Sequence, residues 1–212
     1  MTNIINRRKK GISTVLTTLI IVVASVVLGT AVTLFGTSLF QTGAQNTNMA
    51  VQGQNLWINP DVDSGAPVRP LVEGAFAVRN TGDKLIAVDK IQVRGAIVPF
   101  SQWYASDPAT TTAAMIQSQL LYDTELATAD MASLPATITI TAAGANVTLT
   151  KQSGPVSLDP GKSSIIYHVA PGSLDTDTAN DVITSADVGA AATVAVSAGA
   201  ISSVQAVTVA KV

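Results

Sequence analysis

The stretch RRKKGISTVLTTLIIVVASVVLGTAVTLFGTSLFQ, residues 7–41, decides how this chain is organised. Its first four residues, Arg7–Lys10, are cations, and Gly11 follows them directly. No charged side chain occurs from Gly11 to Pro60. The strongly apolar part is roughly 29 residues long, and at about 1.5 Å per residue it would form a helix of roughly 43 Å. Because the hydrocarbon core of a bilayer requires only about 20 helical residues, the stretch predicts a helix that can span a membrane.

The basic residues at the start of the stretch set its expected orientation. Lysine and arginine beside an apolar span favour the cytoplasmic side, so the rest of the chain is expected outside the membrane. A cleaved secretory signal peptide fits poorly, because its apolar core is about 7–15 residues long. A retained membrane anchor fits both the length and the charge. A third interpretation makes the same helix a membrane span first and a building block of an assembly afterwards.

The third interpretation explains the glycine that follows the cations. Basic residues, a glycine and then a helix of aliphatic and small hydroxyl residues resemble the class III signal peptide of type IV pilin-like precursors. Archaeal type IV pilins and archaellins are the branch that the stretch resembles most. In that family a prepilin-type peptidase cuts after the glycine, on the cytoplasmic side. The resemblance covers the chain from Arg7 to about Gln41.

The resemblance implies specific processing residues and boundaries. Lys9 and Lys10 would precede the cut, which would fall between Gly11 and Ile12. Residues 1–11 would then be the removed leader, and residues 12–41 the helix. Bacterial type IV pilins usually carry a glutamate at the fifth mature position, where this chain has Leu16. Archaeal members commonly lack that glutamate, so the departure favours the archaeal branch.

The predicted helix carries a stripe of small side chains. Residues Ser25, Gly29, Thr33 and Thr37 follow one another at intervals of four. Stripes of this kind allow helix backbones to approach closely in an apolar medium. Their hydroxyls can donate to carbonyls one turn earlier, which lowers the cost of burying them. The stripe therefore predicts helix packing against other helices.

Composition excludes several classes of function. Lysine and arginine number 12 and aspartate and glutamate 14; without the four leader cations the balance is 8 against 14, a net charge of −6. A body this acidic lacks the electrostatic footprint of a nucleic-acid-binding protein. Because the chain has no cysteine, disulfides and thiolate metal sites are excluded.

The sequence after the helix predicts a β-rich body. Residues 42–55 are polar and uncharged and are interpreted as a connector, and residues 56–212 as the extracellular domain. Residues 76–93 alternate apolar and polar side chains around a turn at 80–83, which predicts a hairpin with a bulge in its second strand. Further strands are predicted at 136–141, 146–150, 164–169, 192–197 and 203–209.

Many short strands with turn signals between them favour an Ig-like antiparallel β-sandwich. Archaeal pilins and archaellins combine one N-terminal helix with such a sandwich, so the resemblance implies the same fold: mainly β, with one long hydrophobic helix in front. Residues 110–131 do not fit the strand pattern, and they predict an inserted helix or a surface loop.

Catalytic motifs are missing from the sequence. His168 is the only histidine and lies in a predicted strand, which favours a structural role. No Ser-His-Asp arrangement, P-loop, dinucleotide glycine pattern or H-E-x-x-H occurs. Asp175, Asp177 and Asp181 lie close together near Asp187 and are weak candidates for a calcium loop, although the EF-hand spacing fails. We therefore expect neither an enzyme nor a cofactor.

Two further sets of residues carry expectations. Asn146-Val147-Thr148 is the only N-x-[ST] sequon and a possible glycosylation site on an exported domain. Trp57, Trp103 and Tyr104 are expected in the core.

These observations together predict a structural subunit of an extracellular filament at the cell surface, used for adhesion. Its expected partners are identical copies in a helical filament, a prepilin-type peptidase with the assembly machinery, and the membrane before assembly, but no nucleic acid. Two alternatives stay open: an archaellin of a motility filament, and a signal-anchored binding domain that never polymerises.

Overall fold

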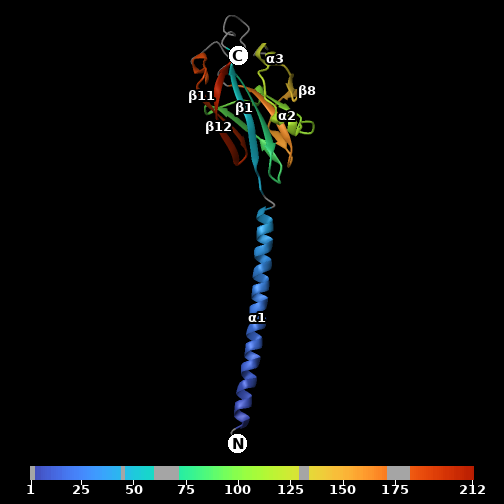
Figure 1. The fold of residues 1–212 in the computed structure, drawn as a ribbon, viewed down its shortest axis with the longest axis vertical. Helices are drawn as coiled ribbons and strands as arrows, with labels where there is room; N and C mark the ends of the chain where they lie inside the picture. The colour runs from blue at the N-terminus through green and yellow to red at the C-terminus, as the bar shows by residue number, and fades with distance from the viewer. Residues whose placement is uncertain (1–2, 44–45, 60–71, 129–133, 171–181) are drawn as a thin grey trace. The chain divides into compact units, whose positions relative to one another are not determined.

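The computed structural model describes residues 3–43, 46–59, 72–128, 134–170 and 182–212, with side chains of the N-terminal helix described from 14 to 39. The chain divides into two compact units, Met1–Asn46 and Thr47–Val212. The first is a helix and the second a β-rich body, so the chain is mainly β with one apolar helix at its N-terminal end (Figure 1).

Helix α1 (Asn3–Gly43) confirms the helix predicted for 12–41 and extends beyond it in both directions. It contains no proline, so no backbone donor is lost along its length. Within it, the segment Thr14–Leu39 has a mean hydropathy of 2.5 and is long and apolar enough to cross a membrane. The expected connector over 42–55 is shorter than predicted, because β1 begins at Met49.

Twelve strands are described in the body. In chain order they are β1 (Met49–Ile58), β2 (Val72–Asn80), β3 (Ile86–Val88), β4 (Lys90–Val93), β5 (Ala96–Ile97), β6 (Trp103–Ser106), β7 (Thr137–Ala142), β8 (Ala145–Lys151), β9 (Val156–Leu158), β10 (Ser163–Val169), β11 (Ala191–Ala198) and β12 (Ile201–Lys211). Ten of them form one sheet in the order β5-β4-β11-β12-β1-β2-β10-β6-β8-β7, and β3 pairs with β9. The five strands predicted outside the hairpin are confirmed as β7, β8, β10, β11 and β12.

Two predictions about strand pairing were wrong. The sheet is mixed and not wholly antiparallel, because β1 and β12 run parallel, with Leu56 opposite Val209. The hairpin predicted over 76–93 does not form: β2 pairs with β1 and β10, whereas the strands after the turn pair with β9 and β11. The side chain of Asn80 explains the turn, since its Nδ2 donates to the carbonyls of Lys84 (2.7 Å) and Leu158 (2.8 Å).

The central strands are buried on both faces of the sheet. Along β2, Phe76 and Val78 belong to one hydrophobic core, and Ala75 and Ala77 to a second. The first core combines residues of β1, β2, β6 and β10 with residues of β3, β4, β9, β11 and β12. The second core lies among β2, β6, β7, β8 and β10. Both expectations for Trp103 and Tyr104 are confirmed, since each is fully buried, while Trp57 is half-buried against the second core.

The segment that did not fit the strand pattern covers the second core. It forms two short helices, α2 (Ala113–Gln117) and α3 (Thr124–Thr128). Thr112 caps α2 by accepting a hydrogen bond from the Met115 amide. Ile116, Leu120 and Leu126 are buried in the second core, so the segment is packed and not merely a surface loop.

Candidate functional site

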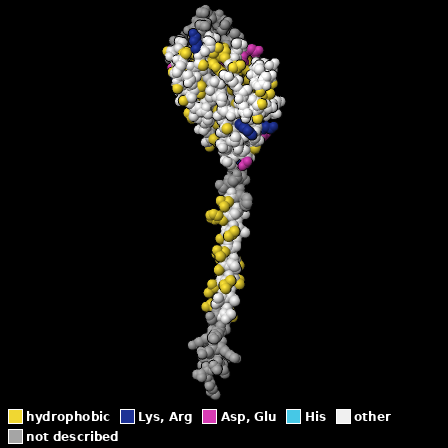
Figure 2. All heavy atoms as spheres, viewed as in Figure 1, with side chains coloured by type: hydrophobic (Ala, Val, Ile, Leu, Met, Phe, Trp, Pro, Cys, Tyr) yellow, Lys and Arg dark blue, Asp and Glu magenta, His cyan; other side chains and the backbone are white. Residues whose placement is uncertain are grey.

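The surface of α1 is the first candidate site. Its described side chains, from 14 to 39, include none that is buried, and none of them is charged. Figure 2 shows hydrophobic side chains along this helix, whereas on the visible face of the body hydrophobic side chains are scattered and a few charged ones are present. A helix that is apolar around its circumference requires an apolar environment.

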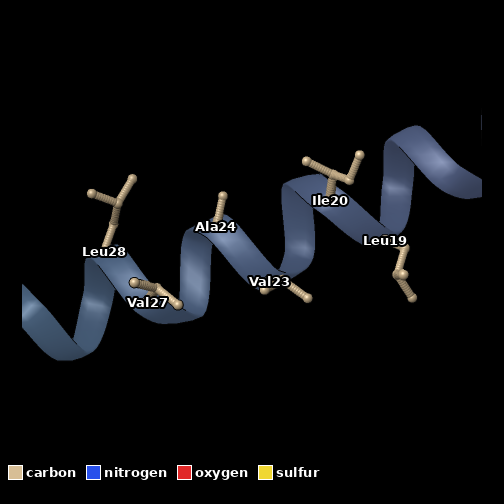
Figure 3. A pocket seen from close by; sticks show the side chains of 6 residues that line it. All are labelled: Leu19, Ile20, Val23, Ala24, Val27 and Leu28. Atoms are coloured by element: carbon tan, nitrogen blue, oxygen red, sulfur yellow. The ribbon is translucent and has the colours of Figure 1, made fainter.

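Large aliphatic side chains form one face of α1. In Figure 3 they make two rows with a spacing of four residues: Ile20, Ala24 and Leu28 in one, and Leu19, Val23 and Val27 in the other. Rows of this spacing are the ridges that interdigitate when helices pack.

The predicted stripe of small residues lies on a different face. At about 100° per residue, Ser25 and Gly29 lie on the opposite side of the helix from the two aliphatic rows. A Cβ added to Gly29 or Gly36 would meet no atom within 4 Å. The backbone is therefore open to close approach along this face, as a packing stripe requires.

The hydroxyl groups of α1 are satisfied within the helix itself, as the sequence predicted. Thr33 Oγ1 donates to the carbonyl of Gly29 (3.1 Å), and Thr37 Oγ1 donates to that of Thr33 (3.0 Å). Ser25 Oγ reaches the Val22 carbonyl at 2.8 Å, and Thr18 and Thr30 make similar bonds. These hydroxyls can therefore enter an apolar medium without losing hydrogen bonds.

The expected processing residues lie inside the same helix. The backbone of Lys9, Lys10, Gly11 and Ile12 belongs to α1, and their side chains fall outside the described part of the chain. Cleavage after Gly11 stays a prediction.

A pair of buried carboxyl groups in the body is the second candidate site. Glu73 on β2 is 2% exposed, and Asp123, which precedes α3, is 6% exposed. The Asp123 amide donates to Glu73 Oε1 at 3.0 Å, and Asp123 Oδ1 accepts from the Glu125 amide at 2.8 Å. The other two oxygens, Glu73 Oε2 and Asp123 Oδ2, have no hydrogen-bond partner among the described residues.

Burial raises the pKa of both carboxyl groups. For Glu73 the pKa lies well above its usual range, because desolvation outweighs the hydrogen bond from Asp123 and the nearby Asp123 charge adds to it. The pKa of Asp123 rises mainly through desolvation as well. In the described part of the chain neither carboxyl forms an ion pair with a lysine or arginine. The sequence alone does not predict this pair, although a glutamate in the otherwise apolar strand VEGAFAV is a signal for it.

Aromatic side chains lie near the carboxyl pair. Tyr167 stacks on Trp57 with ring centroids 6.5 Å apart, and Tyr122 meets Trp57 edge-on at 6.3 Å. The Tyr167 hydroxyl donates to the Leu121 carbonyl at 2.7 Å, which fixes the chain just before Asp123. Desolvation, together with the charges of the two carboxyls, raises the pKa of Tyr167.

A cavity of about 190 Å³ lies beside Asp123. Its wall comes from the segment before and at the start of α3 and from β7 and β10: Leu121, Tyr122, Asp123, Thr124, Thr139, Ile140, Thr141 and Tyr167. Because Thr139 and Thr141 are exposed, the cavity lies close to solvent.

His168 occupies a structural position on the other face of β10. It is buried, its Nδ1 has no hydrogen-bond partner among the described residues, and its ring lies 6.1 Å from that of Phe76. Desolvation lowers the pKa of His168 to about 4. Gly74 lies opposite it on β2, and a Cβ there would be 2.6 Å from the imidazole Cε1. The imidazole is held neutral in an apolar space, which agrees with a structural role.

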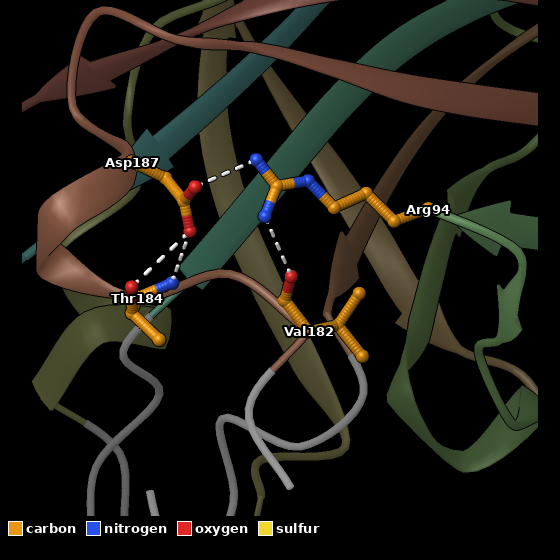
Figure 4. A network of polar contacts seen from close by, with 4 residues as sticks. All are labelled: Arg94, Val182, Thr184 and Asp187. Carbon is orange, nitrogen blue, oxygen red and sulfur yellow. Dashed lines mark hydrogen bonds and ion pairs between the residues drawn. The ribbon is translucent and has the colours of Figure 1, made fainter. Parts of the chain in front are cut away.

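The acidic loop predicted as a weak calcium site is not described. Asp175, Asp177 and Asp181 lie outside the described residues. Their neighbour Asp187 is engaged elsewhere (Figure 4): Arg94 Nη2 contacts Asp187 Oδ1 at 2.7 Å, and the Thr184 amide donates to Oδ2 at 2.8 Å. The Arg94 hydrogen bond lowers the pKa of Asp187 to about 2.

The sequon is accessible on the sheet. Asn146 and Thr148 are exposed on β8, directly after the tight turn at Ala143–Gly144. Glycosylation of Asn146 stays a prediction.

Comparison with known proteins gives little similarity. No family model matches the chain, and no curated protein matches it. Among solved structures, a β-glucosidase from Erythrobacter marinus is similar over 77% of this chain, with 12% sequence identity and a TM-score of 0.27. The match spans only 15% of that enzyme. A similarity this low carries no argument about the fold or the activity of this chain.

Proposed function

We propose that this protein is the structural subunit of an extracellular, type IV pilus-like archaeal filament. The observation that carries the proposal is α1: the segment Thr14–Leu39 is uncharged, has a mean hydropathy of 2.5 and has none of its side chains buried. Such a helix requires either lipid or other apolar helices around it. In this proposal it uses lipid first and identical helices afterwards.

Leader removal supplies the switch between the two environments. While Arg7–Lys10 are attached, four charges hold the N-terminus in the cytoplasm, because each is costly to move into hydrocarbon. After cleavage behind Gly11, the helix carries only a terminal amine. Since the bilayer and the filament core are both apolar, transfer between them costs little, and the satisfied hydroxyls of α1 lose no hydrogen bonds.

The body would form the outer surface of the filament. We propose that it is a sandwich of the Ig-like class, in which the strands β4 and β11 face β2 and β10 across the first core. The support is the membership of that core, which joins both sets of strands. Adhesion is proposed as the use of the filament, through the surface of this body.

The proposal is tested on the native surface material. Electron microscopy of sheared cell-surface fractions, combined with N-terminal peptide mapping, is expected to show filaments whose subunit begins at Ile12. A monomer with Met1 or Thr2 intact would refute the proposal and favour the anchored binding domain. Loss of swimming instead of surface attachment on deletion would identify an archaellin.

A pair of substitutions tests the packing faces of α1. Gly29→Ile fills the small-residue stripe, and Gly29→Ala, which keeps the side chain small, is the matched control. A Cβ at Gly29 meets nothing within 4 Å, and isoleucine is a better helix former than glycine, so the isolated helix should persist in both variants. We expect Gly29→Ile to abolish filaments while membrane insertion persists, and Gly29→Ala to retain them. Equal assembly by both variants would contradict the packing role of the stripe.

A further inference from the structure

We propose that the parallel pair of β1 and β12 is a mechanical clamp, which lets the body carry tension that enters from α1. The inference rests on the proposed function only for the source of this tension, because a subunit held by α1 in a filament is loaded whenever its body is attached to a surface. The clamp itself rests on strand register and packing within one chain. Pulling on a single chain therefore tests it independently of filament assembly.

The two ends of the body lie at opposite ends of β1. The body begins at Thr47, just before β1. Its last residue, Val212, donates its amide hydrogen to the carbonyl of Ile58, the last residue of β1, at 3.1 Å. Strand β1 has 10 residues, which at about 3.3 Å each place the two ends roughly 33 Å apart. Tension between Thr47 and Val212 is therefore directed along β1.

The parallel direction of the two strands decides how this tension acts on them. Leu56 lies opposite Val209, and Ile58 lies opposite Lys211. Tension pulls β1 from its first residue and β12 from its last residue, so the strands are drawn past each other in opposite directions. The hydrogen bonds between them run across the strands and are then all loaded at the same time. If both strands were pulled from the same end, these bonds would open one after another.

Packing prevents the two strands from sliding gradually. Leu56, Ile58 and Val209 are fully buried and belong to the first core. Because successive side chains point to opposite faces of a sheet, a slip by one residue would turn these side chains out of the core. On its other side β1 is held by its antiparallel register with β2. The clamp should therefore hold until its contacts break together.

The first half of β1 is joined to β12 in a different way. The register of β1 with β2 shifts between Gln52 and Asn55, and Gly53 in this bulge has a φ of 64°. Beside the bulge, Gln205 of β12 donates from its Nε2 to the carbonyl of Val51 at 3.1 Å. The registered pairs of the clamp begin at Leu56, so its resistance is expected from the second half of β1.

Single-molecule pulling on the full chain in detergent tests the clamp. The chain has no cysteine, so handles can be attached at introduced ones. The double variant Thr47→Cys with Val212→Cys is pulled along β1 and leaves α1 outside the loaded segment. The matched control, Thr47→Cys with Ala200→Cys, is pulled from one end of the pair, because Ala200 lies in the turn just before β12. All three positions are exposed, so both double variants should fold with equal urea midpoints.

The force at which the body unfolds is the result that decides. At the same loading rate, we expect a force roughly two- to threefold higher for Thr47→Cys with Val212→Cys than for the control, because its contacts break together. Equal forces in the two geometries, or gradual opening of the first variant, would overturn the clamp. A clear difference in force without filaments in native material would refute the filament function alone.

Discussion

Acidification should weaken the body through His168, and the size of the effect follows from its burial. The folded-state pKa of His168 is about 4, whereas an unperturbed histidine has a pKa near 6.5. Between these pH values His168 is protonated in the unfolded chain but not in the folded chain. The free energy of unfolding therefore decreases as the pH falls. A difference of about 2.5 pKa units corresponds to roughly 3 kcal/mol. This contribution is complete above about pH 6.5 and is lost by about pH 4.

The variant His168→Leu isolates this contribution. Leucine removes the unpaired Nδ1 and fills a similar volume, so the free energy of unfolding at pH 7 should change by less than about 1.5 kcal/mol. Between pH 7 and pH 4, however, the variant should gain on the unaltered protein by about 3 kcal/mol. Glu73 and Asp123 act in the opposite direction. Because their pKa values are raised in the folded state, their protonation increases the free energy of unfolding as the pH falls. Their contribution is common to both proteins and cancels in the comparison.

Urea unfolding of the full chain in a non-ionic detergent provides the assay. The chain has two tryptophans, Trp57 and Trp103, and both lie in the body, so fluorescence reports on the sheet and not on α1. Midpoints at pH 7, 6, 5 and 4 give the free energies when the slopes agree. Equal acid sensitivity of the two proteins would refute the assignment to His168.

Two further substitutions test the packing of the two cores. Gly74→Ala places a Cβ against the ring of His168 and should lower the free energy of unfolding by about 1–3 kcal/mol, measured as a lower urea midpoint. Gly154→Ala is the control, because a Cβ there meets nothing within 4 Å. Equal midpoints for the two variants would contradict the close approach of Gly74 to His168. Leu126→Ala removes a buried side chain of the second core and should cost about 2–5 kcal/mol, whereas the exposed Leu121→Ala should stay within about 0.5 kcal/mol. Similar melting temperatures for these two variants would show that α3 does not contribute to the core.

The sequence predicts where the helix and strands of this chain lie better than it predicts which strands pair with one another. The long apolar run from Ile12 to Phe40 is sufficient to predict α1, because within a single segment only a helix satisfies its backbone hydrogen bonds internally. Runs of valine, isoleucine and threonine likewise predict β7, β8, β10, β11 and β12, since alternation is a local property. Pairing is not local. The turn after Asn80 is predictable from the residues in it. The side chain of Asn80, however, donates a hydrogen bond to the carbonyl of Leu158, 78 positions away, and the next strand, β3, pairs with β9.

The contact between the two buried carboxyl groups could not be predicted from local sequence patterns either. Glu73 and Asp123 are 50 residues apart, and their contact depends on how the segment around α3 crosses the second core. Loose helical spacing in residues 110–131 predicts an inserted helix or a surface loop, and neither prediction indicates that Asp123 is buried. Burial changes the chemistry of Asp123, and Tyr167, which lies beside it in the cavity wall, belongs to the distant strand β10.

The parallel pairing of β1 with β12 has a consequence for the order in which the body folds during synthesis. The first strand of the body leaves the ribosome early, but Leu56 and Ile58 pair with Val209 and Lys211, which emerge some 150 residues later. Until then one edge of β1 stays open, and an open apolar edge is prone to pair with another chain. Contacts this distant in sequence also slow folding. The body should therefore complete its sheet only after β12 has emerged, and a chain that lacks β12 should aggregate.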